Sequence, residues 1–338
     1  MIDFSNNVNF IGPPNGFNEL LLNNSNSYFE YPDYQHKAAR NAISEFFNIS
    51  DKSVVISVGA TELLSIMPSF SKKTALGISP SFWEYQHFYI KAHAENKYQK
   101  FVLDQNQDFK FNHIEFEARL SKHEIDICYL ANPNNPTTTR LDKASILDIA
   151  KKNPDVLFVI DETYLPFSAS YQTDSFISEA SVSENIIVIT SMSKIYSLPG
   201  LRVGFGVSHP KNIERLYGHL IPYGVAPFPL VVIPWLLDQK EYISNTNLAY
   251  NERRRYLNAA LSREFGDKVK VVDSGTAFVL IEIKIPLESD FVSRLLSLNI
   301  RVRGGAEFVE LGNQWIRISI RDYCDIDVLI EGLKLILN

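Results

Sequence analysis

Short apolar runs that alternate with helical patterns are the feature that most limits how this chain can fold. The runs are rich in β-branched residues, and each is followed by a small, polar or charged residue. This alternation predicts an α/β fold with an open, mostly parallel sheet and helices on both faces. The predicted strands of that sheet are residues 54–58, 74–78, 127–130, 156–160, 186–190 and 201–207. Because ligands bind outside the carboxyl ends of such strands, we expect one site there.

The pattern predicts two domains that follow an N-terminal arm. Helices are expected at 37–47, 61–69, 143–152 and in a segment ending at Ala92, which gives a large domain over residues 36–238. Beyond Pro229 the pattern changes, and residues 239–338 are expected to form a smaller α+β domain. Its predicted helices are 247–265, 290–297 and 325–337, and its predicted strands are 269–272, 278–283, 300–303 and 315–320.

Residues 1–35 contain many Asn, Pro and Gly residues and few periodic apolar positions. This composition predicts an extended arm, which we expect to pack on the small domain and on a partner subunit. An arm that reaches across a two-fold axis favours a homodimer.

Composition excludes several classes of function. The 338 residues carry a formal net charge of -6 without a block of basic residues, so we expect no nucleic-acid partner. The apolar run 230–237 is interrupted by Pro234 and is too short to span a bilayer, so we expect no membrane segment. Cys128 and Cys324 form neither a disulfide framework nor a metal cluster, and the first residues do not form a secretory signal. We therefore expect a cytoplasmic protein without a metal.

The stretch 186–206 holds a single lysine, Lys194, in a loop after a buried strand. A lysine held in such a place can lose its proton and condense with an aldehyde. Ser191, Ser193 and Arg202 could bind the phosphate that an aldehyde cofactor carries. The alternative is a solvated loop lysine beside serines that cap a strand.

Gly59, Ala60 and Thr61 lie where a predicted strand becomes a helix, and free N–H groups there can bind a phosphate. An ordinary turn with Thr61 as the N-cap is the alternative.

Asp161 follows an apolar strand, where a carboxylate is costly unless it meets a cation such as a protonated pyridine nitrogen. The alternatives are a helix N-cap and a metal ligand of a nucleotide-binding site, but the phosphate loop of such a site is absent.

Three further residues at strand ends could contact the same ligand. Tyr164 and Asn135 could reach a ring hydroxyl, and Phe82 could cover a ring face. An aromatic residue in the position of Phe82 is more often part of the core.

The chain resembles pyridoxal-phosphate enzymes of the aspartate aminotransferase fold (fold type I) over nearly its whole length. The resemblance is carried by Ala131 to Thr137 (ANPNNPT), Asp161 to Tyr164 (DETY) and Ser191 to Gly204 (SMSKIYSLPGLRVG). It implies that pyridoxal 5′-phosphate is the cofactor. Thr138 stands where the family usually has glycine, and the conformation of that turn is left open by the sequence.

The resemblance also implies a role for each matched residue. Lys194 would bond to the cofactor aldehyde, Asp161 would pair with the pyridine nitrogen, and Phe82 would stack on the ring. Tyr164 and Asn135 would bond to the ring hydroxyl, and Arg317 would bind the substrate α-carboxylate. The phosphate would be held by Gly59, Ala60, Thr61, Ser191, Ser193 and Arg202, with Tyr31 reaching it from the neighbouring subunit.

Within this family the chain resembles both histidinol-phosphate aminotransferases and threonine-phosphate decarboxylases. Residues 2–14 (IDFSNNVNFIGPP) and 300–322, which end in IRISIRD, are closer to the decarboxylases. The resemblance thus implies decarboxylation of a phosphorylated amino acid, with transamination as the alternative. A protein that has lost its chemistry and only binds a partner is a third hypothesis.

The substrate phosphate needs a binding group of its own. The decarboxylases carry a His-Gly-Gly segment before their Asp-Phe-Ser, and this sequence has only Met1 and Ile2 there, so we expect the phosphate to be held differently. Arg303 is the first candidate and Arg321 the second. For each, the alternative is a surface salt bridge.

Overall fold

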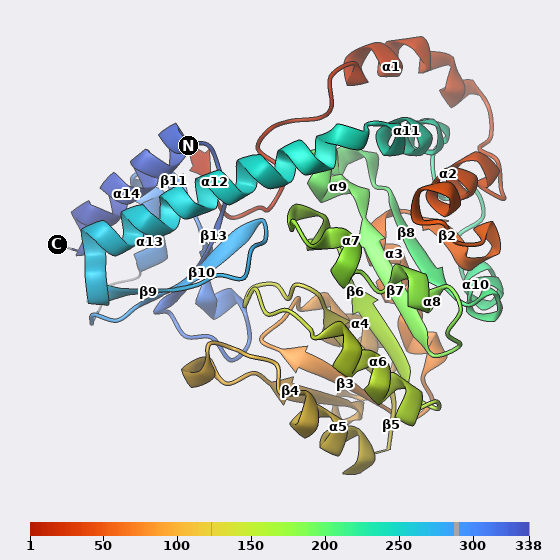
Figure 1. Cartoon of the computed structure of the whole chain (residues 1–338), viewed down its shortest axis with the longest axis horizontal. Coiled ribbons are helices and arrows are strands. Elements are labelled where there is room, and N and C mark those ends of the chain that lie inside the picture. Colours follow the sequence, from red (N-terminus) through yellow and green to blue (C-terminus); the bar gives the residue numbers. More distant parts are fainter. Residues whose placement is uncertain (123, 287–290, 338) are drawn as a thin grey trace.

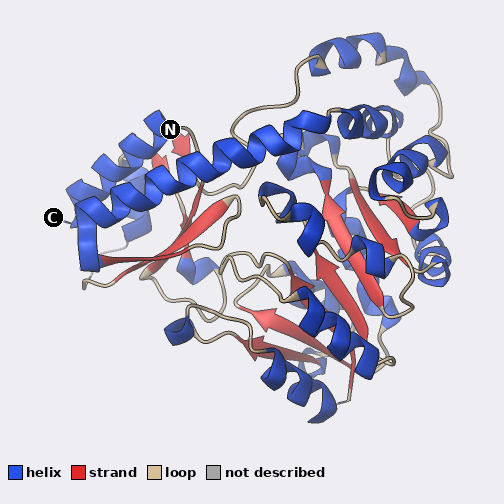
Figure 2. Ribbon diagram, in the orientation of Figure 1, coloured by secondary structure: helices blue, strands red, loops and turns tan. Residues whose placement is uncertain are grey.

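The computed structural model describes residues 1–122, 124–286 and 291–337, and its largest part is a seven-stranded sheet covered by helices (Figures 1 and 2). The strand order is β2-β8-β7-β6-β5-β3-β4, and all strands are parallel except β8. This confirms the predicted fold class. The strands are β2 (Val54–Ser57), β3 (Thr74–Ser79), β4 (Tyr98–Val102), β5 (Ile125–Ala131), β6 (Leu157–Asp161), β7 (Ile186–Ser191) and β8 (Gly204–Ser208).

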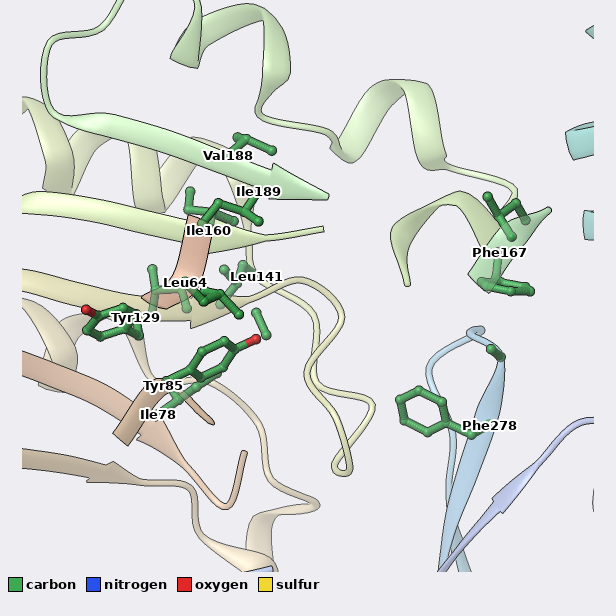
Figure 3. Close-up of a cluster of buried hydrophobic side chains, with 14 of the residues drawn as sticks. Leu64, Ile78, Tyr85, Tyr129, Leu141, Ile160, Phe167, Val188, Ile189 and Phe278 are labelled. Atoms are coloured by element: carbon green, nitrogen blue, oxygen red, sulfur yellow. The ribbon is translucent and has the colours of Figure 1, made fainter. Parts of the chain in front are cut away.

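The central strands are buried on both faces, which explains their nearly continuous apolar sequence. Ile160, Val188 and Ile189 are fully buried in the cluster that Figure 3 shows. The register pairs Ala131 of β5 with Asp161 of β6. The polar residues that follow these strands therefore meet at one edge of the sheet.

Helices cover both faces of this sheet. In Figure 1, α5, α6 and α8 pass in front of it, and α3 and α4 lie behind it. Helix α6 shows the local signals clearly, because Asp142 caps its first turn by accepting from the Ser145 N–H at 2.8 Å and two lysines occupy its last turn. The helices are α2 (Lys37–Phe47), α3 (Gly59–Ile66), α4 (Glu84–Ala92), α5 (His113–Lys122), α6 (Lys143–Lys152), α7 (Tyr171–Asp174), α8 (Ile177–Ala180), α9 (Met192–Ile195), α10 (Pro210–Tyr217) and α11 (Pro227–Asp238).

A second, antiparallel sheet has the order β12-β13-β10-β9. The long helix α12 runs from the region of α9 and α11 to this sheet, where α13 and α14 also pack (Figure 1). Among the described residues, no helix combines the length and the apolar composition that crossing a bilayer requires. The elements are β9 (Val269–Val272), β10 (Phe278–Ile283), β12 (Arg303–Gly304), β13 (Trp315–Ser319), α12 (Lys240–Phe265), α13 (Phe291–Ser297) and α14 (Tyr323–Leu337).

The start of the chain connects the two sheets. Strand β1 (Ile2–Asp3) pairs in parallel with β11 (Ile300–Arg301) in a separate two-stranded sheet. The Phe4 carbonyl accepts from the N–H of Ser319, the last residue of β13 in the four-stranded sheet, at 3.1 Å. A few residues later, the Asn9 side chain donates to the Ile195 carbonyl at 2.7 Å, and the Asn9 N–H donates to the Lys194 carbonyl at 3.1 Å. The N-terminal segment thus contacts both the backbone that carries Lys194 and the second sheet.

Four predictions on secondary structure need correction. Residues 1–35 are not wholly extended, because they contain α1 (Phe17–Asn23), which has no buried residue and hence no clear periodic signal. Strand β8 begins at Gly204 rather than 201, because residues 199–201 form a 3₁₀ turn and Arg202 has a φ of 51°. The predicted strand 300–303 is divided into β11 and β12. Helix α12 begins at Lys240, seven residues before the predicted start. The predicted start of α13 at Asp290 lies outside the described residues.

Candidate active site

A cavity of about 330 Å³ lies at the carboxyl ends of β2, β3, β5, β6 and β7. Ten predicted residues line it: Ala60, Thr61, Phe82, Asn135, Asp161, Tyr164, Ser191, Ser193, Lys194 and Arg202. It is also lined by residues that the sequence did not single out, which are Leu64, Glu84, Tyr85, Ala131, Pro133, Thr163 and Pro199.

One end of the cavity is built to bind an anion. Gly59 has a φ of 71°, and a Cβ on it would lie 2.8 Å from Nη2 of Arg202, so the guanidinium passes directly over this glycine. Helix α3 begins here, and the first N–H groups of a helix lack partners within it. A cation, free N–H groups and the nearby hydroxyls of Ser191 and Ser193 are the donors that a phosphate needs.

Lys194 lies on the short helix α9, directly after β7, and not in the loop that the sequence predicted. The Ser191 hydroxyl caps this helix by accepting from the Ser193 N–H at 3.2 Å. Together with the contact between Asn9 and the Lys194 carbonyl, this cap fixes the backbone that carries the amine. The side chain of Lys194 lines the cavity beside Ser193 and Arg202.

Asp161 lies at the end of β6 with both carboxylate oxygens hydrogen-bonded. Its Oδ1 accepts from the Thr163 N–H at 2.8 Å, and its Oδ2 accepts from the Tyr85 hydroxyl at 2.8 Å. Burial raises the pKa of Asp161, and the hydrogen bonds from Thr163 and Tyr85 oppose this rise. A buried carboxylate prepared in this way is suited to a cationic partner.

The opposite side of the cavity leads to the second sheet through Asn135. Nη1 of Arg317 donates to Oδ1 of Asn135 at 2.6 Å, and Nη2 donates to the Ser5 carbonyl. Arg317 is 5% exposed, and this burial lowers its pKa to about 10. The ring of Tyr164 lies edge-on to Phe278 at 5.1 Å.

The remaining predicted site residues do not line the cavity. Arg303 forms an ion pair with Glu307 at 3.1 Å, and Arg321 pairs with Asp325 at 2.7 Å. Tyr31 is 85% exposed and lies 5.2 Å from the ring of Tyr223.

The turn that contains Thr138 has a defined geometry. Thr138 adopts a φ of 60°, the left-handed conformation that glycine favours, and it is buried. Its N–H donates to the Asn134 carbonyl at 2.8 Å, and its own carbonyl accepts from the Ser274 hydroxyl. Threonine therefore occupies this turn in the conformation that glycine would take.

Tyr85 is the most informative residue that the sequence analysis missed. It lies in the first turn of α4, three residues after Phe82, which precedes the helix, and the turn between them brings the two rings together. Its closeness in sequence to Phe82 is the signal that could have identified it. Nothing in the local sequence indicates that its hydroxyl meets Asp161.

The fold and this site define a class of pyridoxal-phosphate enzymes in which a lysine, an aspartate and an anion-binding helix start surround the cofactor. The model of the family described as aminotransferase class I and II matches residues 2–333. The chain belongs to this family, and its cofactor is pyridoxal 5′-phosphate.

Individual relatives are similar over the whole chain. A protein of Caldanaerobacter subterraneus subsp. tengcongensis, which carries the provisional name threonine-phosphate decarboxylase, is 28% identical over 97% of this chain and 88% of its own. The crystal structure of the histidinol-phosphate aminotransferase from Clostridium acetobutylicum covers 99% of this chain and 98% of its own, with a TM-score of 0.91 and 23% identity. The crystal structure of the histidinol-phosphate aminotransferase from Sinorhizobium meliloti in complex with pyridoxal-5′-phosphate covers 99% of this chain and 90% of its own. Its TM-score is 0.85 and its sequence identity is 20%.

The residues present fit this cofactor. The cavity offers an amine for the aldehyde at Lys194 and a carboxylate for the ring nitrogen at Asp161. Arg202 and the start of α3 offer a cradle for the phosphate, and any residue larger than Gly59 would fill that cradle. Amine, carboxylate and cradle border one cavity, as a single bound molecule requires.

Proposed function

We propose that this protein decarboxylates L-threonine O-3-phosphate to aminopropanol phosphate, a precursor of the cobalamin side chain. The observation that carries the proposal is Arg317, a buried cation whose hydrogen bonds go only to neutral acceptors in the described part of the chain. Its Nε has no hydrogen-bond partner among the residues that the structure describes. Among the described residues, the carboxylates of Glu307 and Asp3 act on Arg317 only without ion-pair contact. A buried charge without a contacting counter-ion is costly, and the α-carboxylate of a substrate would supply one.

A second cation lies beside the first. Arg303 is directly opposite Arg317 in the register of β12 and β13, so the two side chains leave the sheet on the same face. Each guanidinium lies over the ring of Phe308, at 5.7 Å for Arg303 and 5.9 Å for Arg317. Two cations side by side suit a substrate with two anionic groups, an α-carboxylate and a phosphate. We assign the phosphate to Arg303, because Arg321 also donates to the Asp3 carbonyl at 3.2 Å and is held against the N-terminal strand.

In this proposal the protein decides which bond breaks by orienting the substrate. Bound pyridoxal phosphate supplies the conjugated ring that accepts the electron pair of that bond. Arg317 would bind the α-carboxylate and Arg303 the phosphate, and together they would fix the orientation of the substrate that selects the bond to carbon dioxide for cleavage. The Lys194 amine would then return a proton to the α-carbon. Asn135 and Tyr164 would contact the ring hydroxyl.

The test is to supply phosphothreonine without any keto acid. We expect release of carbon dioxide and an aminoalcohol phosphate, with no product from a Lys194→Ala protein. Strict dependence on 2-oxoglutarate would instead identify an aminotransferase. A protein that binds phosphothreonine but catalyses neither reaction would point to a binding role. The presence of Lys194, Asp161 and Tyr164 in one cavity argues against such a role.

We further propose that the protein acts as a homodimer and that Tyr31 completes the phosphate site of the neighbouring subunit. Tyr31, which is 85% exposed, is the most exposed member of an aromatic group with Tyr34 and Tyr223, whose exposures are 49% and 50%. Gly224, next to Tyr223, lies against Val58, the residue before the phosphate cradle. This group is therefore close to the cavity but leaves the Tyr31 side chain free to contact another chain.

A further inference from the structure

The hydroxyl of Tyr85 makes a contact that packing alone does not require. Tyr85 is buried, and its ring is stacked on Tyr129 with an interplanar angle of 13° and a centroid distance of 5.9 Å. Phe82 meets the same ring edge-on at 5.7 Å. Figure 3 shows the Tyr85 ring among Leu64, Ile78 and Tyr129, with its hydroxyl pointing to the end of the sheet where the strands finish. A phenylalanine would pack equally well there, so the hydroxyl needs another explanation.

The partner of that hydroxyl is the carboxylate that faces the cofactor ring nitrogen. A carboxylate has about four sites at which its two oxygens can accept hydrogen bonds. Thr163 occupies one on Oδ1 and Tyr85 occupies one on Oδ2 of Asp161. Both oxygens are thereby fixed by the protein, and each keeps capacity for a donor in the cavity.

We propose that Tyr85 is a positioning residue that holds the Asp161 carboxylate toward the pyridine nitrogen of the cofactor. The same ring contacts Phe82, so Tyr85 connects the residue that covers the ring face with the residue that pairs with the ring nitrogen. This inference concerns cofactor binding and does not depend on which reaction follows.

The electrostatics of the pair agree with this role. Burial raises the pKa of the Tyr85 hydroxyl well above its ordinary value, so it stays protonated and can only donate to the carboxylate. Burial also raises the pKa of Asp161, and the hydrogen bond from Tyr85 acts in the opposite direction. Tyr85 therefore favours the ionised carboxylate, which is the form that pairs with a protonated ring nitrogen.

The test uses Tyr85→Phe in the full chain, with Tyr129→Phe as the matched control. Tyr129 belongs to the same buried stack, but its hydroxyl has no hydrogen-bond partner among the residues that the structure describes. The probe is pyridoxine 5′-phosphate, which lacks the aldehyde and so reports binding without a bond to Lys194. We expect the dissociation constant to rise roughly tenfold or more in Tyr85→Phe, as for loss of a hydrogen bond to a charged group. In Tyr129→Phe it should stay within about twofold.

Two further measurements separate positioning from packing. An analogue in which a CH group replaces the ring nitrogen should bind Tyr85→Phe and the unmodified protein within about twofold of each other, because it makes no pair with Asp161. In an Asp161→Asn background, adding Tyr85→Phe should likewise change the affinity for pyridoxine 5′-phosphate by less than about twofold. Equal weakening for both probes, an undiminished effect in the Asp161→Asn background, or no effect of Tyr85→Phe would each overturn the proposal. Thermal unfolding of each cofactor-free variant checks that the fold is intact. If Tyr85→Phe is not folded, Tyr85→Met, which also lacks the hydroxyl, takes its place with both probes.

Discussion

Glu162 is a fully buried carboxyl at the residue next to Asp161, and it serves the scaffold of the site. Its two oxygens accept from the Phe176 N–H and the Ser175 hydroxyl, each at 2.6 Å. Burial raises its pKa to about 7. The role of Glu162 is to fix the segment after α7, directly behind the strand end that carries Asp161.

The raised pKa of Glu162 predicts a pH-dependent stability. Between the ordinary pKa of 4.5 and the folded pKa of about 7, the folded state binds more protons than the unfolded state. The contribution of Glu162 to the free energy of unfolding is therefore complete below about pH 4.5 and is lost as the pH rises through about 7, by at most about 3 kcal/mol. Glu162→Gln should lack this component. Urea unfolding of cofactor-free protein at about pH 5 and about pH 8 measures it.

The control for this prediction is Glu184→Gln. Glu184 is exposed and pairs with Lys211 at 2.7 Å, so its removal should leave the pH dependence of the unmodified protein in place. If Glu162→Gln lost stability between the two pH values as strongly as the unmodified protein does, titration of Glu162 would not be the cause.

At the scale of elements, the turn after β5 is expected to tolerate a substitution of Thr138 by glycine with little loss of stability. Thr138 is a β-branched residue in a left-handed conformation, which costs of order 1–3 kcal/mol. In Thr138→Gly, relief of this strain should offset the lost burial and the larger entropy of the unfolded chain, so that the free energy of unfolding stays within about 1 kcal/mol. Chemical denaturation gives the value.

Thr137→Gly tests the same turn without such relief. Thr137 is fully buried, and its hydroxyl bonds with the Asn134 amide at 2.7 Å and with the Thr139 hydroxyl at 2.6 Å. Its replacement should cost about 2 kcal/mol or more. Equal losses in the two variants would show that Thr138 carries no strain that glycine relieves.

Sequence patterns were sufficient to predict the strands whose residues are buried along nearly their whole length. Strands β5, β6 and β7 are apolar on both faces, and the residues that follow them point to the cofactor site without any structure. Strand β4 was missed because it is an edge strand with mostly half-buried residues, including Gln99 and Lys100, and so has no continuous apolar run. Short edge strands carry little of the signal on which such predictions rest.

The contacts that complete the site could not be predicted, because they join residues far apart in the chain. Tyr85 reaches Asp161 across 76 positions, and Arg317 reaches Asn135 across 182. No local pattern encodes such pairings; they follow from the strand order and from the packing of the second sheet against the first. The sequence could name several members of the site, but it could not state which of them bond to one another.

At the scale of the whole molecule, a charged contact connects the two sheets beside the cavity. Glu310, in the loop after the 3₁₀ turn Gly305–Glu307, accepts from Lys100 of β4 at 2.9 Å and from the Ser79 hydroxyl at the end of β3. The same loop carries Phe308, over which both candidate substrate arginines lie. The contact therefore holds the loop that frames the proposed substrate site.

Breaking this contact should affect substrate binding more than stability. Partly exposed ion pairs contribute about 1 kcal/mol or less, so Glu310→Gln and Lys100→Met should unfold within about 1 kcal/mol of the unmodified protein. We expect each substitution to raise KM for phosphothreonine several-fold. In the double variant, KM should be little higher than in either single variant. Steady-state kinetics with phosphothreonine measures this. A change in kcat alone, with KM unaltered, would contradict a role in holding this loop at the substrate site.

The proposed dimer makes a prediction that no single chain could fulfil. If Tyr31 acts on the partner's phosphate site, Lys194→Ala and Tyr31→Ala proteins should each have low activity alone, since every site in each homodimer lacks one of the two groups. Mixed under conditions that exchange subunits, they should form heterodimers in which one site has both an intact Lys194 and an intact Tyr31. Activity should then rise to a substantial fraction of that of the unmodified enzyme. If Tyr31 acted within its own chain, both sites of the heterodimer would remain defective and mixing would restore nothing.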